Sequence, residues 1–104
     1  MNEPIVMTMS HRLGREEARR RLEGGFAGML GSLPGGSLLR LEQRWTGDRL
    51  DFSAKGMGQQ VTGRVDVLDD AVRVELVLPP FLASLAERFR DTLASAGQRL
   101  LGPK

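Results

Sequence analysis

The chain has 104 residues, of which 40% are hydrophobic and 27% are charged, a balance typical of one folded domain. It contains no cysteine, which excludes disulfides, thiolate metal ligands and cysteine nucleophiles. One histidine and no tyrosine leave few groups for acid–base chemistry or for binding zinc. We therefore expect a single domain over residues 1–104 without a metal or a cofactor.

The formal net charge is only +2, although the isoelectric point is about 9.9, because most of the basic residues are arginine. Acidic residues are interleaved with every arginine cluster, so the basic stripe of a nucleic-acid-binding protein is missing. The longest apolar run, residues 77–83, is far shorter than the roughly 20 residues of a membrane-spanning helix. The first residues lack the features of a signal peptide, and we expect a cytoplasmic protein.

Residues 4–10 alternate weakly in polarity, which predicts a short strand. The following segment changes to helical spacing, with Gly14 expected as N-cap and Glu17 as the third residue of a capping box. Glycines at 24, 25, 28 and 31 leave two alternatives open: close packing of this helix on the sheet, or a break near Gly24-Gly25. Residues 33–36 are expected to end the helix.

Residues 38–78 predict four antiparallel strands in one continuous meander. Turns at 47–48, around 57–58 and at 69–70 place the strands in a register that separates two faces. One face carries a single polar side chain among its apolar ones: Leu41, Gln43, Trp45, Leu50, Phe52, Ala54, Val61, Gly63, Val65, Val67, Val72, Val74, Leu76 and Leu78.

The other face of the predicted sheet tests the same register independently. Five pairs of cross-strand neighbours on it have opposite charge: Arg44–Asp51, Asp51–Arg64, Arg64–Glu75, Arg49–Asp66 and Asp66–Arg73. Such pairs favour a register by about 0.2–1 kcal/mol each. A shift by one residue would mix the two faces, so we expect one apolar and one solvated face.

Residues 80–101 predict a second helix, with Pro80 at its first position and Gly102 beyond its end. The resulting fold class is α+β with the element order β-α-β-β-β-β-α, an antiparallel sheet, and both helices packed on one face. The first strand is expected antiparallel to residues 70–78, at an edge. This order of elements is similar to that of a small helix-grip fold.

Few residues of the sequence are candidates for catalysis or for binding a metal. Ser10-His11 lacks an evident carboxylate to orient the imidazole, and His11 is expected to bond backbone groups near the helix start. The acid pairs Glu16-Glu17 and Asp69-Asp70 fit a helix start and a hairpin turn. We therefore predict no catalytic residue and no metal ligand.

Two groups of residues are candidates for binding. Trp45, Gln43 and Gly63 lie at the end of the apolar face, where the alternatives are core packing or a cavity that binds an apolar ligand. The second helix has a wide apolar side that includes Phe81, Leu82 and Phe89. This side either packs on the sheet or contacts an apolar particle surface, a partner helix or a second subunit.

Three motifs resemble those of a bacterial family, the polyhydroxyalkanoic acid system proteins: His11-Arg12-Leu13-Gly14, Glu16-Glu17-Ala18-Arg19 and Trp45-Thr46-Gly47-Asp48. The similarity continues through residues 63–67 and 72–76 and so covers nearly the whole chain, departing from the family pattern in the glycine-rich residues 24–36. The resemblance implies a link to the metabolism or granules of polyhydroxyalkanoate storage polyesters, and it carries over no catalytic residue.

We therefore expect a non-enzymatic accessory protein of polyester storage, in the cytoplasm and associated with granules. It would bind an apolar surface through its helices, or an acyl-type ligand near Trp45. The alternative is a small protein–protein adaptor, monomeric or dimeric, without lipid or polyester contact. A hydrolytic enzyme comes third, with His11 as its only candidate base.

Overall fold

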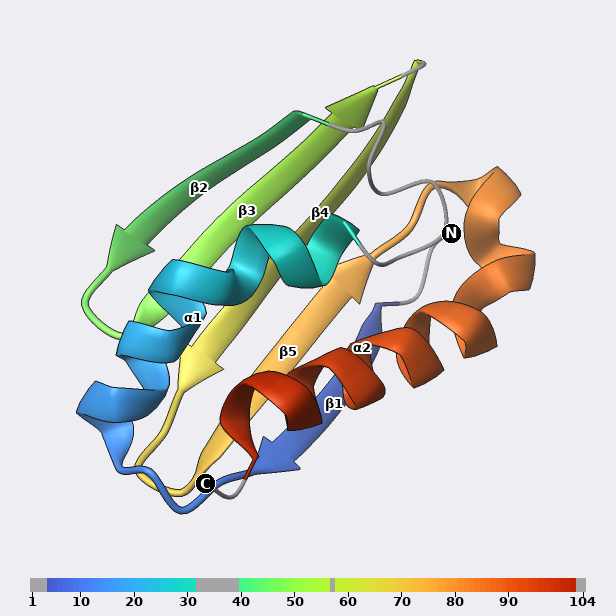
Figure 1. Cartoon of the computed structure of the whole chain (residues 1–104). Helices are drawn as coiled ribbons and strands as arrows, with labels where there is room; N and C mark the ends of the chain where they lie inside the picture. The colour runs from blue at the N-terminus through green and yellow to red at the C-terminus, as the bar shows by residue number, and fades with distance from the viewer. Residues whose placement is uncertain (1–3, 32–39, 57, 103–104) are drawn as a thin grey trace.

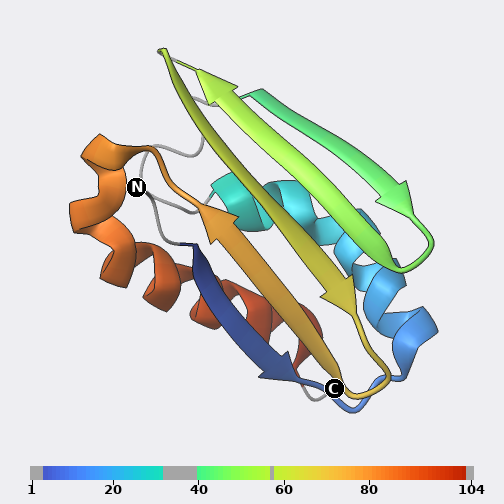
Figure 2. The same cartoon turned by 180° about the vertical axis from the view of Figure 1, so that it is seen from behind.

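The computed structural model describes residues 4–31, 40–56 and 58–102. Five strands form one antiparallel sheet in the order β1-β5-β4-β3-β2. Both helices lie on the same face of the sheet (Figure 1), and no described element crosses the opposite face (Figure 2). The elements in chain order are β1 (Ile5–Ser10), α1 (Arg15–Gly31), β2 (Arg40–Thr46), β3 (Arg49–Gly56), β4 (Gln59–Val67), β5 (Ala71–Val77), the 3-10 helix η2 (Pro80–Leu85) and α2 (Ala86–Leu101). The predicted α+β element order is thus confirmed.

The register of the meander is the one that the sequence predicts. Trp45 pairs with Leu50, and Gln43 pairs with Phe52, across the β2–β3 hairpin. Gly63 is flanked by Phe52 on β3 and by Leu76 on β5. The two-residue turns fix these pairs, because a one-residue shift would turn the buried valines of β4 and β5 toward water: Val61, Val65, Val67, Val72 and Val74.

Strand β1 is the edge strand beside β5, as predicted. It runs antiparallel to β5, with Ile5 opposite Leu76 and Met9 opposite Val72. Its alternation places Ile5 and Met9 in the core, whereas Val6 is more than one third exposed on the other face. The weak period of two in the sequence is therefore sufficient to orient this strand.

The core lies between the apolar face of the sheet and the two helices. Phe26 of α1 and Phe52 of β3 meet edge to face, with ring centroids 4.8 Å apart. Leu22 of α1 and Leu93 of α2 are each 1% exposed in the same cluster of buried residues. Burial of each such side chain contributes about 1.5–3 kcal/mol, so the two helices are held mainly by this layer.

Gly63 is required by close packing. A Cβ atom at this position would overlap the backbone oxygen of Glu75 and the ring of Phe52. The Phe52 ring thus occupies the space that a side chain of β4 would fill, and this position lets Phe52 meet Phe26.

The first helix continues unbroken through Gly24-Gly25, and its glycines do not serve to approach the sheet. A Cβ at Gly25 would meet the side chain of Leu100 on α2, whereas a Cβ at Gly24 or Gly28 would meet nothing. The two alternatives expected from the sequence, close packing of these glycines on the sheet and a break of the helix, are therefore both wrong. The close approach, at Gly25, is between α1 and α2. The predicted helix end at 33–36 and the turn residue Met57 lie outside the described residues.

The predicted single helix over residues 80–101 is divided at Leu85. A 3-10 turn begins after Pro79, and Leu85, with φ −100° and ψ 10°, separates it from α2. The direction of the chain changes there (Figure 1), so α2 spans less of the sheet than one continuous helix would. It ends at Leu101 before Gly102, as predicted. The comparison with a helix-grip fold stays a prediction, since the sheet is open and two helices share its apolar face.

Replacement of Gly63 by alanine tests the packing of Phe52. We expect Gly63→Ala to lower the free energy of unfolding by about 2–3 kcal/mol, because the backbone oxygen of Glu75 cannot move aside easily. The matched control, Gly28→Ala, should raise it by about 0.5–1 kcal/mol, because the helix gains a better former in open space. Urea unfolding measures both, and equal effects of the two changes would contradict this packing.

Candidate functional site

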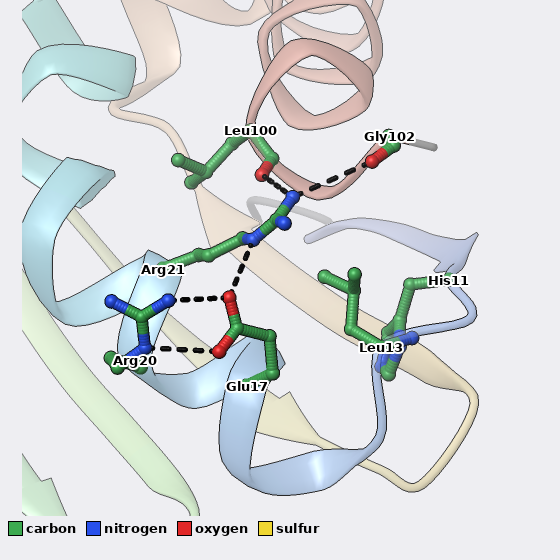
Figure 3. Close-up of polar contacts among 7 residues, drawn as sticks. All are labelled: His11, Leu13, Glu17, Arg20, Arg21, Leu100 and Gly102. Carbon is green, nitrogen blue, oxygen red and sulfur yellow. Dashed lines mark hydrogen bonds and ion pairs between the residues drawn. The ribbon is translucent and has the colours of Figure 1, made fainter. Parts of the chain in front are cut away.

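The first motif builds a corner of the molecule with the β4–β5 turn. The backbone N–H of His11 donates to the carbonyl of Asp70 (2.9 Å), and the ring Nε2 lies 3.1 Å from the carbonyl of Leu68. The backbone N–H of Leu13 donates to His11 Nδ1 at 3.2 Å (Figure 3 shows both residues). Because Leu13 N–H can only donate, Nδ1 accepts and Nε2 carries the proton. Both ring nitrogens of this buried histidine are thus engaged by backbone, as the sequence predicts.

Arg15 ties the start of α1 to two turns of the sheet. Its guanidinium contacts Asp48 of the β2–β3 turn at 3.2 Å and Asp69 of the β4–β5 turn at 3.1 Å. The hydrogen bond with Asp48 and the charge of Asp69 raise the pKa of Arg15. Gly14, with φ 81°, lets the chain turn into the helix, and its carbonyl accepts the N–H of Ala18 as expected of an N-cap. We call His11, Gly14, Arg15, Asp48 and Asp69 the motif corner.

Glu17 and Arg21 join α1 to the end of α2 (Figure 3). The sequence predicts that Glu17 closes a capping box, but its carboxylate accepts hydrogen bonds from Arg20, at 2.6 and 2.9 Å, and from Arg21 at 3.0 Å. The bonds from Arg20, then those from Arg21, lower the pKa of Glu17. Arg21 also donates to the carbonyls of Leu100 (3.2 Å) and Gly102 (3.4 Å), where the terminal carbonyls of α2 favour a cation.

The predicted ligand residues Trp45, Gln43 and Gly63 are only partly brought together. Trp45 is half-buried and Gln43 is exposed, and both lie on the helix-side face of β2. Gly63 is two strands away under the ring of Phe52, which stands between it and Gln43. We call Leu41, Gln43 and Trp45 the β2 shelf: they are the helix-side residues of an outermost strand of the sheet, and each of them is at least partly exposed.

The β2 shelf is bordered by one residue of α1. The guanidinium of Arg19 stacks over the Trp45 ring, 4.7 Å from its centroid, and forms an ion pair with Glu23 at 3.2 Å. Its Nε is buried and has no hydrogen-bond acceptor among the described residues. Arg19 is thus held over the shelf by the aromatic ring and one carboxylate, without a full set of hydrogen bonds.

Of the three predicted apolar contact residues on the second helix, Phe89 is the one whose side chain the structure describes. Phe89 is 2% exposed and belongs to the core, so it offers no surface to a partner. It shares the buried face of α2 with Leu93, Ala96 and Leu101. The side chains of Phe81 and Leu82 lie outside the described residues.

A surface hollow beside the motif corner is lined by charged side chains of both signs. Arg49 contacts Asp66 at 3.0 Å, and Arg73 lies 3.9 Å from the same carboxylate. Arg15 and Asp48 complete the charged lining. Each of the three arginines lies within 4 Å of a carboxylate, with Arg49 and Arg73 sharing Asp66, so the hollow offers an anion no unpaired arginine. Among the described residues, no group of three or more His, Asp or Glu side chains is placed to hold a metal ion.

Sequence reasoning missed Arg15 and Arg19. Arg15 is the first residue of α1, directly before Glu16 and Glu17, and it belongs to no periodic pattern of the sequence. The signal that could have found it is topological: the turns at 47–48 and 69–70 lie at the same end of the predicted sheet, so Asp48 and Asp69 are available to one cation.

The ion pairs of Glu17 predict a pH dependence of stability. A carboxyl whose pKa is lower when folded stabilises the protein above its ordinary pKa of about 4.3, and the stabilisation disappears as the pH falls through the lower value. We expect Glu17→Gln to lower the urea midpoint at pH 7 and to match the wild type near pH 2. The control Glu16→Gln should change the midpoint less, because Glu16 has no ion-pair partner among the described residues. A constant difference between wild type and Glu17→Gln at all pH values would contradict this role.

Comparison with known proteins agrees with the motifs. The family described as "Putative polyhydroxyalkanoic acid system protein" matches residues 5–100, from β1 to the last turn of α2. No curated protein sequence matches the chain. No helix in the described residues is long and apolar enough to cross a membrane. The match spans the corner, the meander and both helices, and the chain therefore belongs to the polyhydroxyalkanoic acid system family.

Proposed function

We propose that this protein is a non-catalytic accessory protein of polyhydroxyalkanoate storage, and that it binds the polyester, or acyl chains of the same kind, on the β2 shelf. Membership of the family supports the link to the polyester. The observation that carries the binding mode is the position of Trp45: a partly exposed aromatic ring on the outermost strand of the sheet, where α1 contributes the Arg19 guanidinium stacked over the ring.

The chemistry of the shelf suits a chain of alternating esters and short aliphatic groups. Leu41 and Trp45 offer apolar surface to methylene and methyl groups. The amide of Gln43 and the guanidinium of Arg19 are donors at the border of this surface, within reach of ester carbonyls. A mainly apolar surface with a few placed donors is the usual composition of a site for such ligands.

A non-catalytic role is supported by how the chemically capable groups are used. His11 is buried at 5% exposure, with one ring nitrogen donating to backbone and the other accepting from it. Arg15 is paired with both Asp48 and Asp69 at the motif corner. These groups hold turns together, and we assign the function to the shelf.

Trp45 is the single tryptophan, so its fluorescence reports directly on the shelf. We expect isolated polyester granules, and oligomers of 3-hydroxybutyrate, to shift its emission saturably. In co-sedimentation with granules, Trp45→Ala should weaken binding about tenfold, the effect of losing about 1.4 kcal/mol, while Trp45→Phe should retain most of it. Val6→Ala is the matched control, since Val6 is an exposed apolar residue on the opposite face.

Protein-stripped granules and inert apolar beads complete the design. Saturable binding to granules and not to beads would support the proposal. Equal binding to every apolar surface, or binding that Trp45→Ala leaves unchanged, would contradict the shelf as the site. Absence of binding to granules and oligomers alike would contradict the proposed function and favour an adaptor that contacts only protein.

A further inference from the structure

The two edges of the sheet differ in how they are covered. Beside β1, α2 packs against the edge strand and extends beyond it (Figures 1 and 2), with Gly97 against the side chain of Met9. Beside β2, no described element lies along the outer edge. An uncovered edge strand presents a row of unpaired backbone N–H and C=O groups, which is a template for another strand.

The hairpin determines which backbone groups of β2 face outward. A two-residue loop closes on a hydrogen-bonded pair, which here is Thr46 and Arg49. On the other side of β3, Val67 N–H donates to the carbonyl of Asp48 at 2.9 Å, which fits the same alternation. It follows that the backbone groups of Leu41, Gln43 and Trp45, the residues of the β2 shelf, face away from β3.

The side chains of β2 select one way of pairing with a second copy. Antiparallel pairing that keeps apolar face beside apolar face and pairs at least five residues of β2 (Arg40–Thr46) can be centred on residue 42, 43 or 44. A centre at 42 places Glu42 against Glu42, and a centre at 44 places Arg44 against Arg44. A centre at Gln43 instead places Glu42 against Arg44 of the second copy, twice across the two-fold axis.

We propose that the chain forms a symmetric dimer by antiparallel pairing of β2 with β2 of a second copy, centred on Gln43. The two five-stranded sheets then continue as one. In this register Leu41 and Trp45 pair with Trp45 and Leu41 of the second copy, and their outward backbone groups are satisfied. Glu42 and Arg44 form non-hydrogen-bonded pairs, in which cross-strand side chains come closest.

The proposed register continues a pattern already present within one chain. On the charged face, Arg44 lies opposite Asp51, Asp51 opposite Arg64, and Arg64 contacts Glu75 at 2.9 Å. Glu42 of the second copy extends this alternation of signs across the interface. The charges of β2 also disfavour the other two registers, so they act against indiscriminate edge pairing while permitting this one.

Charge reversal at Glu42 and at Arg44 tests the dimer without the use of any ligand. We expect sedimentation velocity to give a concentration-dependent mass approaching twice the 11.4 kDa of one chain. Glu42→Arg and Arg44→Glu should each raise the dissociation constant at least tenfold, because each places like charges opposite one another at both symmetry-related positions. An equimolar mixture of the two variants should dimerise again, since the copy with arginine at both positions then faces a copy with glutamate at both.

The matched control is Arg40→Glu, a charge reversal on the same strand and face. Arg40 faces Thr46 of the second copy in this register, so the dissociation constant should stay within about threefold of the wild type. Circular dichroism confirms that each variant is folded. A wild type that stays monomeric, single variants that associate as the wild type does, or a mixture that stays monomeric would each overturn the proposal. The outcome is independent of granule binding, so failure of the dimer leaves the proposed function standing.

Discussion

The constraint on which the rest of the structure depends is the buried layer between the apolar face of the sheet and the two helices. The link from Arg15 to Asp48 and Asp69 sets where α1 begins on that layer. It fixes the first residue of α1 against two turns of the sheet, and His11 fixes the strand that precedes it. Once the start of the helix is set, its apolar residues fall on the core and Arg21 reaches the carbonyls at the end of α2. The position of Arg19 over Trp45 follows from the same placement.

Several arginines of this chain connect parts of the fold to one another through ion pairs and hydrogen bonds. Exposed ion pairs are individually worth about 0–1 kcal/mol, so their value here is geometric. Arg15 joins turns, Arg21 joins helices, and Arg64 lies between Asp66 and Glu75 on the open face. The pairing of these arginines with carboxylates and carbonyls is the structural counterpart of the low net charge of +2.

The register of the meander could be predicted because two independent patterns, apolar on one face and alternating charge on the other, agree on it. The packing of the two helices on one another and the division of the second helix could not be predicted in this way. Gly25 has no sequence pattern that names Leu100 as its neighbour, and the division at Leu85 depends on tertiary packing that a period of 3.6 does not contain. Of the candidate site, Trp45 and Gln43 lie together as expected, whereas Gly63 is explained by Phe52 and Phe89 by the core.

Of the quoted motif residues, His11, Gly14 and Asp48 build the motif corner, whereas Arg19 and Trp45 lie at the β2 shelf. In this account the corner is purely architectural, which leaves binding to the shelf. Long-range ¹H–¹⁵N correlation of the His11 imidazole tests that claim most directly. The account predicts a neutral ring with its proton on Nε2, donated to Leu68, and an unprotonated Nδ1 that accepts from Leu13. A ring with its proton on Nδ1, or one that exchanges between tautomers, would leave a nitrogen free for other chemistry and contradict the corner as purely architectural.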